Sequence, residues 1–337
     1  IFKDLIDRNL EKETNKQAGW THDLMALGLE CFGLAAWRGG GGRTALKDDF
    51  MAVVESRASK LTENGLIDDI SGLRTIAIQS HGRQGEQDGY EFIHKSFGEY
   101  LTARAMIADA KGLIRQLQRE DDPITAKEAA AKWATLVSSA ELTKDVIDFL
   151  RGEAKLAFAQ SREQTIIAKS DLTRVFSYAQ MHGFPMAEAG HPSYRQAETH
   201  QRCAEGALLT VLSAIAGTVP REEGDDAHLI KPQWPTGKTV YRFLYGDNLS
   251  TAARDCIQRL WRADAPAIRY GLARLDLSLS WLERMYLSGA NLSGADLREA
   301  DLSGADLREA KCNRLHIDSA RLHSADLSET VDLQQDQ

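Results

Sequence analysis

The chain has 337 residues, enough for two or three domains and for an apolar core without disulfides or metal. Hydrophobic residues make up 43% and charged residues 27%, which is typical of a folded globular protein and excludes a mostly disordered chain. The net charge of −8 argues against a protein that coats nucleic acid. The longest uncharged stretch, residues 206–220, is shorter than the ~20 residues of a membrane span. Its four scattered cysteines form no CxxC pair, so we expect reduced thiols in a cytoplasmic protein.

Residues 1–108 show mixed helix and strand patterns. Apolar residues recur at helical spacing over 23–37, beginning near Thr21 or His22 and ending at Gly39–Gly42. A second helix is predicted over 44–61 and ends at Asn64-Gly65, where a left-handed cap is favoured. Strands are predicted at 73–78 and 90–93, joined by a polar loop at 80–89. Two helices followed by a hairpin indicate a winged-helix domain.

Residues 109–265 are predicted to form a helical domain. The spacing Ser96-Phe97-Gly98-Glu99 predicts a capping box at the start of the helix that leads into it. Amphipathic patterns follow at 126–139, 143–149, 164–181, 195–216 and 251–262. Three prolines and an acidic cluster predict a long surface loop at 220–237. The acidic runs 120–122 and 222–226 are interpreted as solvated loops rather than metal sites, and no zinc or other metal site is predicted.

A strict five-residue repeat occupies residues 266–330. Leucine recurs at every fifth position from 272 to 327 except at Cys312 and Ile317, and alanine precedes most of these leucines by two residues. A period of five fits neither a helix nor a continuous strand, but it fits short strands joined by regular corners. Residues two apart on a strand point to the same side, so both series are expected to fill the interior. The predicted interior residues are Leu287, Leu292, Leu297, Leu302, Leu307, Ala290, Ala295, Ala300 and Ala305.

This stretch resembles the pentapeptide-repeat family, whose consensus is A(D/N)LXX. The unit Ala295-Asp296-Leu297-Arg298-Glu299 matches it directly, whereas Ser280 and Met285 stand in alanine positions. The resemblance implies a right-handed quadrilateral β-helix with four units per coil and about three coils. A solenoid end normally needs a cover. We therefore expect the polar tail, residues 331–337, or a partner to cover the last coil, and an oligomer through this end is one form of such a partner.

The segment from Tyr90 to Ala105 resembles the closing motif of the winged-helix domain in NACHT-type signalling NTPases, the STAND class. Its pattern is roughly F-x-H-x-S/T-F-x-E-Y/F-L-x-A. The matching residues are Phe92, His94, Ser96, Phe97, Glu99, Tyr100, Leu101 and Ala103. The resemblance implies that His94 contacts the β-phosphate of ADP and holds an inactive state. A histidine just ahead of a helix N-terminus can donate to a phosphate. The alternative is that His94 satisfies backbone groups at the junction.

No phosphate-binding loop accompanies that histidine in the sequence. The triplet Gly237-Lys238-Thr239 ends like a P-loop, but Pro232 stands in place of the first glycine, and Gly39–Gly42 is followed by no lysine. We therefore predict no catalytic residue, no ATP hydrolysis and no cofactor for this chain alone. ATP or ADP with Mg²⁺ would belong to a larger parent protein whose ATPase core lies upstream of Ile1.

The favoured interpretation is a non-catalytic regulatory and sensor region of a bacterial NACHT/STAND NTPase in signalling or anti-phage defence. Its β-helix would dock a protein partner or the chain's own upstream NTPase domain, without nucleic acid or membrane.

Two alternatives remain. A free-standing pentapeptide protein could mimic DNA and bind topoisomerase, but residues 270–329 carry seven basic and ten acidic residues, a short and mixed rod. A winged-helix transcription factor needs a basic face, whereas residues 47–60 mix Lys47, Arg57 and Lys60 with acids.

Overall fold

The computed structural model divides the chain into two compact units, which are described separately. The first contains residues 1–109 and 148–150, and the second contains residues 110–147 and 151–337. Within the described residues, no helix is long and apolar enough to cross a membrane. The structure describes residues 6–8, 10–11, 19–39, 43–63, 65–66, 73, 78–84, 87–137, 140, 142–185, 194–220, 227–232, 257 and 272–331.

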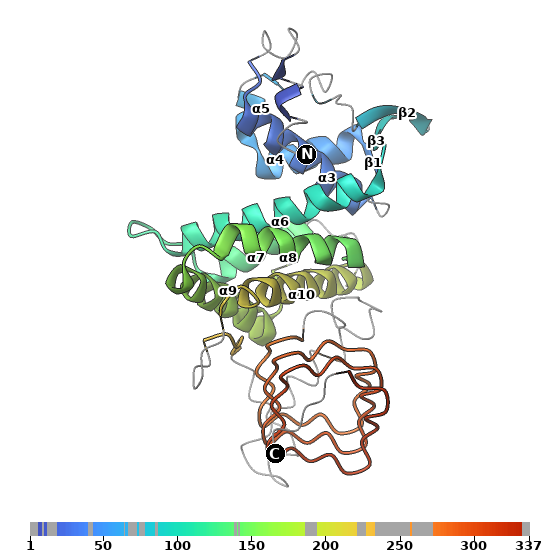
Figure 1. Cartoon of the computed structure of the whole chain (residues 1–337). Helices are drawn as coiled ribbons and strands as arrows, with labels where there is room; N and C mark the ends of the chain where they lie inside the picture. Colours follow the sequence, from blue (N-terminus) through green and yellow to red (C-terminus); the bar gives the residue numbers. More distant parts are fainter. Residues whose placement is uncertain are drawn as a thin grey trace. The chain divides into compact units, whose positions relative to one another are not determined.

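The first unit combines helices with a small antiparallel sheet (Figure 1). In chain order it contains α3 (His22–Arg38), β1 (Thr44–Leu46), α4 (Lys47–Arg57), α5 (Ser59–Glu63), β2 (Ile78–Gln84), β3 (Gln87–Phe92) and the start of α6 (Lys95–Leu117). The sheet order is β1-β3-β2. Thr21 is the N-cap of α3, because its hydroxyl accepts a hydrogen bond from Leu24 N at 3.3 Å. Gly65, with φ +66°, follows α5 as the sequence predicts.

Three predictions about this unit are wrong in detail. The second helix predicted over 44–61 is interrupted at Ala58, which separates α4 from α5. Residues 44–46 form strand β1 rather than the first turn of a helix, because Thr44 pairs with Glu91 and Leu46 with Gly89 of β3. Most of the predicted polar loop at 80–89 lies in β2 and β3, which pair with each other. Backbone pairing with a neighbouring strand does not need apolar side chains, so the alternation rule misses it. The predicted strand at 73–78 lies largely outside the described residues.

Aromatic rings form the core of the first unit. Phe32 of α3 contacts Phe92 of β3 edge-on with ring centroids 4.8 Å apart, and Phe92 contacts Phe97 of α6 at 5.7 Å. Helices α3 and α6 approach closely at Gly33, where an added Cβ would lie 2.7 Å from Leu101 Cβ. This contact places the start of α6, which directly follows His94, against the aromatic core.

Four further helices follow in the described part of the chain: α7 (Ala126–Val137), α8 (Lys144–Phe158), α9 (Arg162–His182) and α10 (Tyr194–Ala216), and all belong to the second unit except residues 148–150 of α8. Helix α9 packs against α7 and α10 (Figure 1), and the indole of Trp133 in α7 donates to Ala204 O in α10 at 3.0 Å. A capping box does occur, but at Thr125 and Glu128 before α7. The predicted helix at 251–262 and most of the loop at 220–237 lie outside the described residues.

The repeat coil, residues 272–331, winds in four-sided turns (Figure 1, orange to red). Parallel bridges join residues that are 20 positions apart, such as Asp276 with Asp296 and Asp296 with His316. Each turn therefore contains four pentapeptides, as the predicted β-helix requires. The nine leucines and alanines expected inside are each at most 2% exposed. Stacking these side chains removes a continuous apolar column from water.

The two ends of the repeat coil differ. At the N-terminal end, Ile230 adds a bridge to Leu275, and the hydroxyl of Ser213 in α10 donates to Ala273 O at 3.3 Å. At the C-terminal end, the inward residues of the last turn are only half-buried, Leu322 and Leu327 among them. Residues 332–337 lie outside the described part of the chain, so the predicted cover of this end stays a prediction.

Position along the coil should set the cost of removing an interior side chain. We expect Leu302→Ala, at a fully buried site, to destabilise the coil by about 2–5 kcal/mol because it leaves a cavity. The matched change Leu327→Ala, at the half-buried end, should cost about half of that or less. Native-state hydrogen exchange of peptides from 272–331 measures both opening free energies. Equal losses of opening free energy in the two variants would contradict closer packing of the interior away from the C-terminal end.

Candidate functional sites on the repeat coil and at the start of helix α6

The corners of the repeat coil share one backbone conformation. At every fifth residue from 274 to 329, φ is positive, and the next residue's amide closes a turn, as Ala300 N does to Leu297 O at 3.0 Å. A positive φ at the third position is the mark of a type II turn. Only three of these corners are glycine. The others are Arg274, Leu279, Arg284, Glu299, Glu309, Arg314, Ser319, Ser324 and Glu329.

Where an Asp or Asn precedes an interior leucine, its side chain supports the following corner with a hydrogen bond. Asp301 Oδ1 accepts a hydrogen bond from Ser303 N at 3.0 Å, and Asn291 Oδ1 accepts one from Ser293 N at 3.1 Å. This local bond favours a turn over any continuing strand. No role was predicted for these positions from the sequence, although the choice of Asp or Asn in the consensus was a signal for such a bond. The same bond occurs at Asp276, Asp296, Asp306 and Asp326.

Many of the outward charges are paired on the coil itself. Arg308 donates to both carboxylate oxygens of Asp306, at 2.9 and 2.7 Å, and Arg298 does the same to Asp296. The Arg308 hydrogen bond holds the pKa of Asp306 below its usual value. These pairs leave the coil surface with alternating signs rather than one strong field.

One part of this surface carries aromatic side chains. Trp281 and Tyr286 occupy the outward positions of successive pentapeptides in the first turn, and Tyr286 is 53% exposed. Arg284 lies at the corner between them, and Arg308 follows Asp306, which bridges to Tyr286 one turn later. We call Trp281, Arg284, Tyr286 and Arg308 the aromatic patch. Trp, Tyr and Arg are the residue types that dominate binding energy at protein interfaces.

His94 lies exposed between β3 and α6. Its backbone oxygen accepts a hydrogen bond from Phe97 N at 3.1 Å, while Phe92 and Phe97 of the same motif are in the ring cluster. Glu99, expected to complete a capping box, instead lies inside α6 and pairs with Lys95 at 3.3 Å. The triplet 237–239 is outside the described residues. The imidazole is thus open to a ligand, and the described residues bring no P-loop to it.

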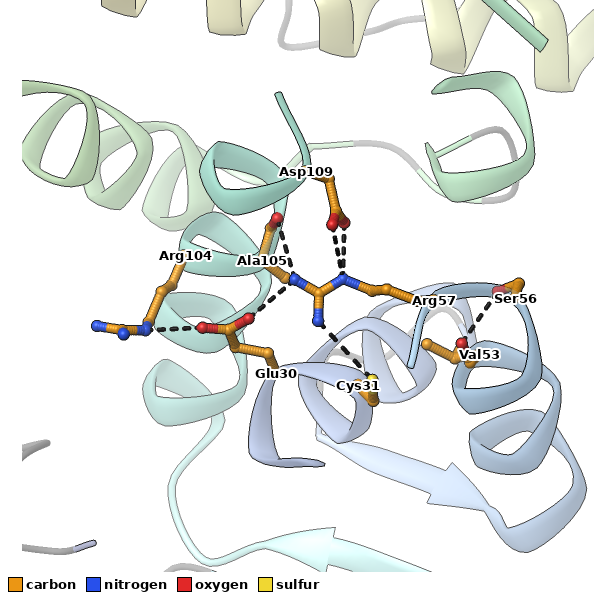
Figure 2. A network of polar contacts seen from close by, with 8 residues as sticks. All are labelled: Glu30, Cys31, Val53, Ser56, Arg57, Arg104, Ala105 and Asp109. Carbon is orange, nitrogen blue, oxygen red and sulfur yellow. Dashed lines mark hydrogen bonds and ion pairs between the residues drawn. The ribbon is translucent and has the colours of Figure 1, made fainter. Parts of the chain in front are cut away.

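A buried polar network joins three helices of the first unit (Figure 2). Arg57 of α4, with a side chain 7% exposed, donates to Asp109 of α6 at 2.7 Å and to Glu30 of α3 at 2.8 Å. Glu30 also accepts from Arg104 of α6 at 2.8 Å. Burial alone would lower the pKa of Arg57, but the carboxylates of Asp109 and Glu30 outweigh it and raise that pKa. Two cations and two anions therefore compensate one another, with Arg57 and Glu30 buried and Arg104 partly exposed.

This network sets the surroundings of Arg57 and Cys31. Arg57 counted as part of a mixed face that DNA could meet, but its guanidinium points into the unit and contacts Cys31 Sγ at 3.8 Å. Burial raises the pKa of Cys31 to about 11, so its thiol is neutral at physiological pH and a poor nucleophile. Among the described residues, no group of histidine, cysteine and acidic side chains could hold a metal ion.

Comparison with known proteins identifies one segment. Residues 286–323 match the family of pentapeptide repeats, with eight copies of the repeat. No curated protein matches the chain, and no solved structure matches it either. The repeat region near the C-terminus is therefore shown, while the N-terminal unit and the helices are known from their own geometry alone.

The Asp306 side chain should contribute stability that depends on pH. Its pKa in the folded chain is below 3.8, so the contribution is present above that pH and is lost as pH falls through the lower folded value. We expect Asp306→Asn to keep the backbone bond, as Asn291 does, and to flatten the fall in melting temperature below pH 4. Asp306→Ala should lose about 0.5–1.5 kcal/mol at all pH values. Calorimetry at neutral and acidic pH separates the variants, and identical profiles would contradict this role.

Removing Arg57 should destabilise the first unit strongly. We expect Arg57→Ala to cost about 3–5 kcal/mol, because Glu30 and Asp109 would keep buried charges without their cation. Arg119→Ala, at an exposed position after α6, is the matched control and should stay within about 0.5 kcal/mol. Urea unfolding followed by tryptophan fluorescence gives both values. The double variant Glu30→Ala with Arg57→Ala should lose less than the sum, and strict additivity would refute the coupling.

Proposed function

We propose that this chain is a non-catalytic regulatory and protein-interaction region in which the repeat coil is the docking surface. The observation that carries the proposal is the aromatic patch, where Tyr286 is half exposed on an otherwise polar coil. A four-sided coil with hydrogen-bonded corners holds such side chains on a rigid backbone, which lowers the entropy lost on binding. The partner class is a protein with an apolar pocket rimmed by carboxylates, which would accept the aromatic rings and the arginines.

The first unit supports a more specific assignment within this proposal. Its order of helix, strand, two helices, two strands and helix, with sheet order β1-β3-β2, is the arrangement expected of a winged helix. His94 is exposed at the strand-to-helix junction, where the NACHT/STAND resemblance requires a phosphate contact. We therefore propose that the unit acts as the winged helix of a signalling NTPase, with ADP bound by a P-loop core encoded upstream. Anti-phage defence is the corresponding biological setting.

The DNA-mimic alternative receives less support from the coil. Such a mimic needs a continuous acidic surface, whereas Arg298, Arg308 and Arg321 lie against Asp296, Asp306 and Asp301. Lys311 and Asn291 lie in one column on another face. Columns of paired charges and a column with a lysine interrupt the negative surface potential that a DNA mimic needs.

Site-specific crosslinking tests the docking surface. A photoreactive phenylalanine at position 286 of the full chain, expressed in its host, should give one protein adduct, and the same probe at Ser319, on the last turn, should give none. With the identified partner purified, Tyr286→Ala should weaken binding by about tenfold or more, while Ser319→Ala should leave it unchanged. No adduct from position 286, or equal adducts from both positions, would refute the docking role.

The NTPase assignment has a separate test. An antibody raised to this chain should detect a native product far above 37.3 kDa, and that product should carry a P-loop segment and co-purify with ADP. Replacing His94 with alanine in that protein should speed ADP release. A native product that has no P-loop would exclude the NTPase assignment and leave the docking proposal standing.

A further inference from the structure

A cavity of about 680 Å³ opens in the second unit between α9 and residues 227–231, beside Ala126 at the start of α7. Sites for small molecules commonly have volumes of about 300–1,000 Å³. The cavity is distant in sequence from the aromatic patch and from His94. It therefore requires an account of its own.

The described lining of the cavity carries three cations. Lys169, Arg174 and Lys231 line it, and no acidic residue is among its described lining. Lys169 is only 7% exposed, and its ammonium donates to the carbonyl oxygens of Ala227, at 2.5 Å, and Leu229. Arg174 also bonds Asp171 at 2.6 Å, a residue outside the lining. Two carbonyl dipoles fix the buried ammonium, so its charge is held at the floor of the cavity.

Apolar side chains share this lining with the cations. Ile166, Tyr178, Met181 and Leu229 contribute to it, and the ring of Tyr178 is supported by His182 with centroids 4.8 Å apart. Met181 is 46% exposed at the mouth. Thioether and aromatic surfaces of this kind pack against flat organic groups.

We propose that this cavity binds a small organic anion, with one carboxylate or phosphate group on an aromatic or apolar body. Lys169 supplies the fixed charge at the floor, and Arg174 and Lys231 supply adjustable charges nearer the mouth. Inorganic anions lack a body for the apolar residues of the lining, and neutral aromatics lack a charged group for its cations. Both halves of the ligand are therefore needed for tight binding.

The cavity is connected to the repeat coil through one short segment. Residues 227–231 line the cavity, and in the same segment Ile230 N donates to Arg274 O at 2.8 Å while Asp276 N donates to Ile230 O at 2.9 Å. A bound anion that holds Lys231 and Leu229 also holds this added strand. Ligand binding should therefore protect the first turn of the coil from opening. The binding itself does not depend on the proposed docking function.

Calorimetric titration of the full chain tests the ligand class with four probes. AMP and indole-3-acetate carry an anion on an aromatic body, adenosine lacks the anion, and inorganic phosphate lacks the body. At least one of the first two should bind about tenfold more tightly than both of the others, and the better of the two distinguishes phosphate from carboxylate. Failure of both to bind with a Kd below about 10 mM overturns the proposal.

Variants assign the binding to this cavity. Lys231→Gln and Arg174→Gln change side chains that are exposed, so the fold should survive, and each should weaken the bound probe by about tenfold. Lys155→Gln, an exposed lysine on α8 outside the cavity, should leave binding unchanged. On binding, amides of 227–231 and of Asp276 should exchange more slowly with deuterium. Equal weakening by Lys155→Gln, or protection confined to other segments, would overturn the assignment.

The chain's own acidic run is the competing occupant. Glu222, Glu223, Asp225 and Asp226 immediately precede the cavity segment in sequence. A variant with all four changed to the corresponding amides should bind the probe about as tightly as the native chain does. If only that variant binds the probe, the cavity serves the chain's own carboxylates, and the proposal of a free ligand falls.

Discussion

The left-handed corner at every fifth residue is the constraint on which the repeat coil depends. Twelve such corners turn the chain through four sides per winding, so residues 20 positions apart come into register and form parallel bridges. Nine of the corners carry side chains that ordinarily avoid positive φ. Asx hydrogen bonds, turn closure and the burial of leucine and alanine together offset that strain. The same corners fix the direction of every outward side chain, including the aromatic patch.

The first unit is held together by a different principle. It has no repeat, and its helices meet through a cluster of aromatic rings and through Arg57, which bonds one carboxylate from α3 and one from α6. An ion network of this kind specifies one arrangement of three helices because any other leaves a charge buried alone. The start of α6, with His94, is thereby placed on a defined framework.

The segment 227–231 has two roles within the second unit. Its carbonyl oxygens hold the ammonium of Lys169 in α9, and its Ile230 extends the first turn of the coil by one strand. Backbone bonds thus join the N-terminal end of the coil to this segment, and the side chains of Lys169 and Ser213 join the segment and the coil to the helices, while the last turn remains half-buried. One short segment therefore contacts both the repeat coil and helix α9.

The sequence by itself determined the repeat coil. A period of five with leucine and alanine inside fits short strands joined by regular corners, and each corner is built from local hydrogen bonds. It also indicated the positions of α3, α7, α9 and α10, whose apolar faces recur at helical spacing. Most of 80–89 forms strands by local pairing of β2 with β3, which the sequence does not reveal because these residues lack an apolar alternation. Only the tertiary structure decided that residues 44–46 form a strand, since their partners in β3 lie far along the chain. The burial of Arg57 was decided in the same way. Its partners Glu30 and Asp109 lie 27 and 52 residues away, and no local pattern records which charges will meet when helices pack.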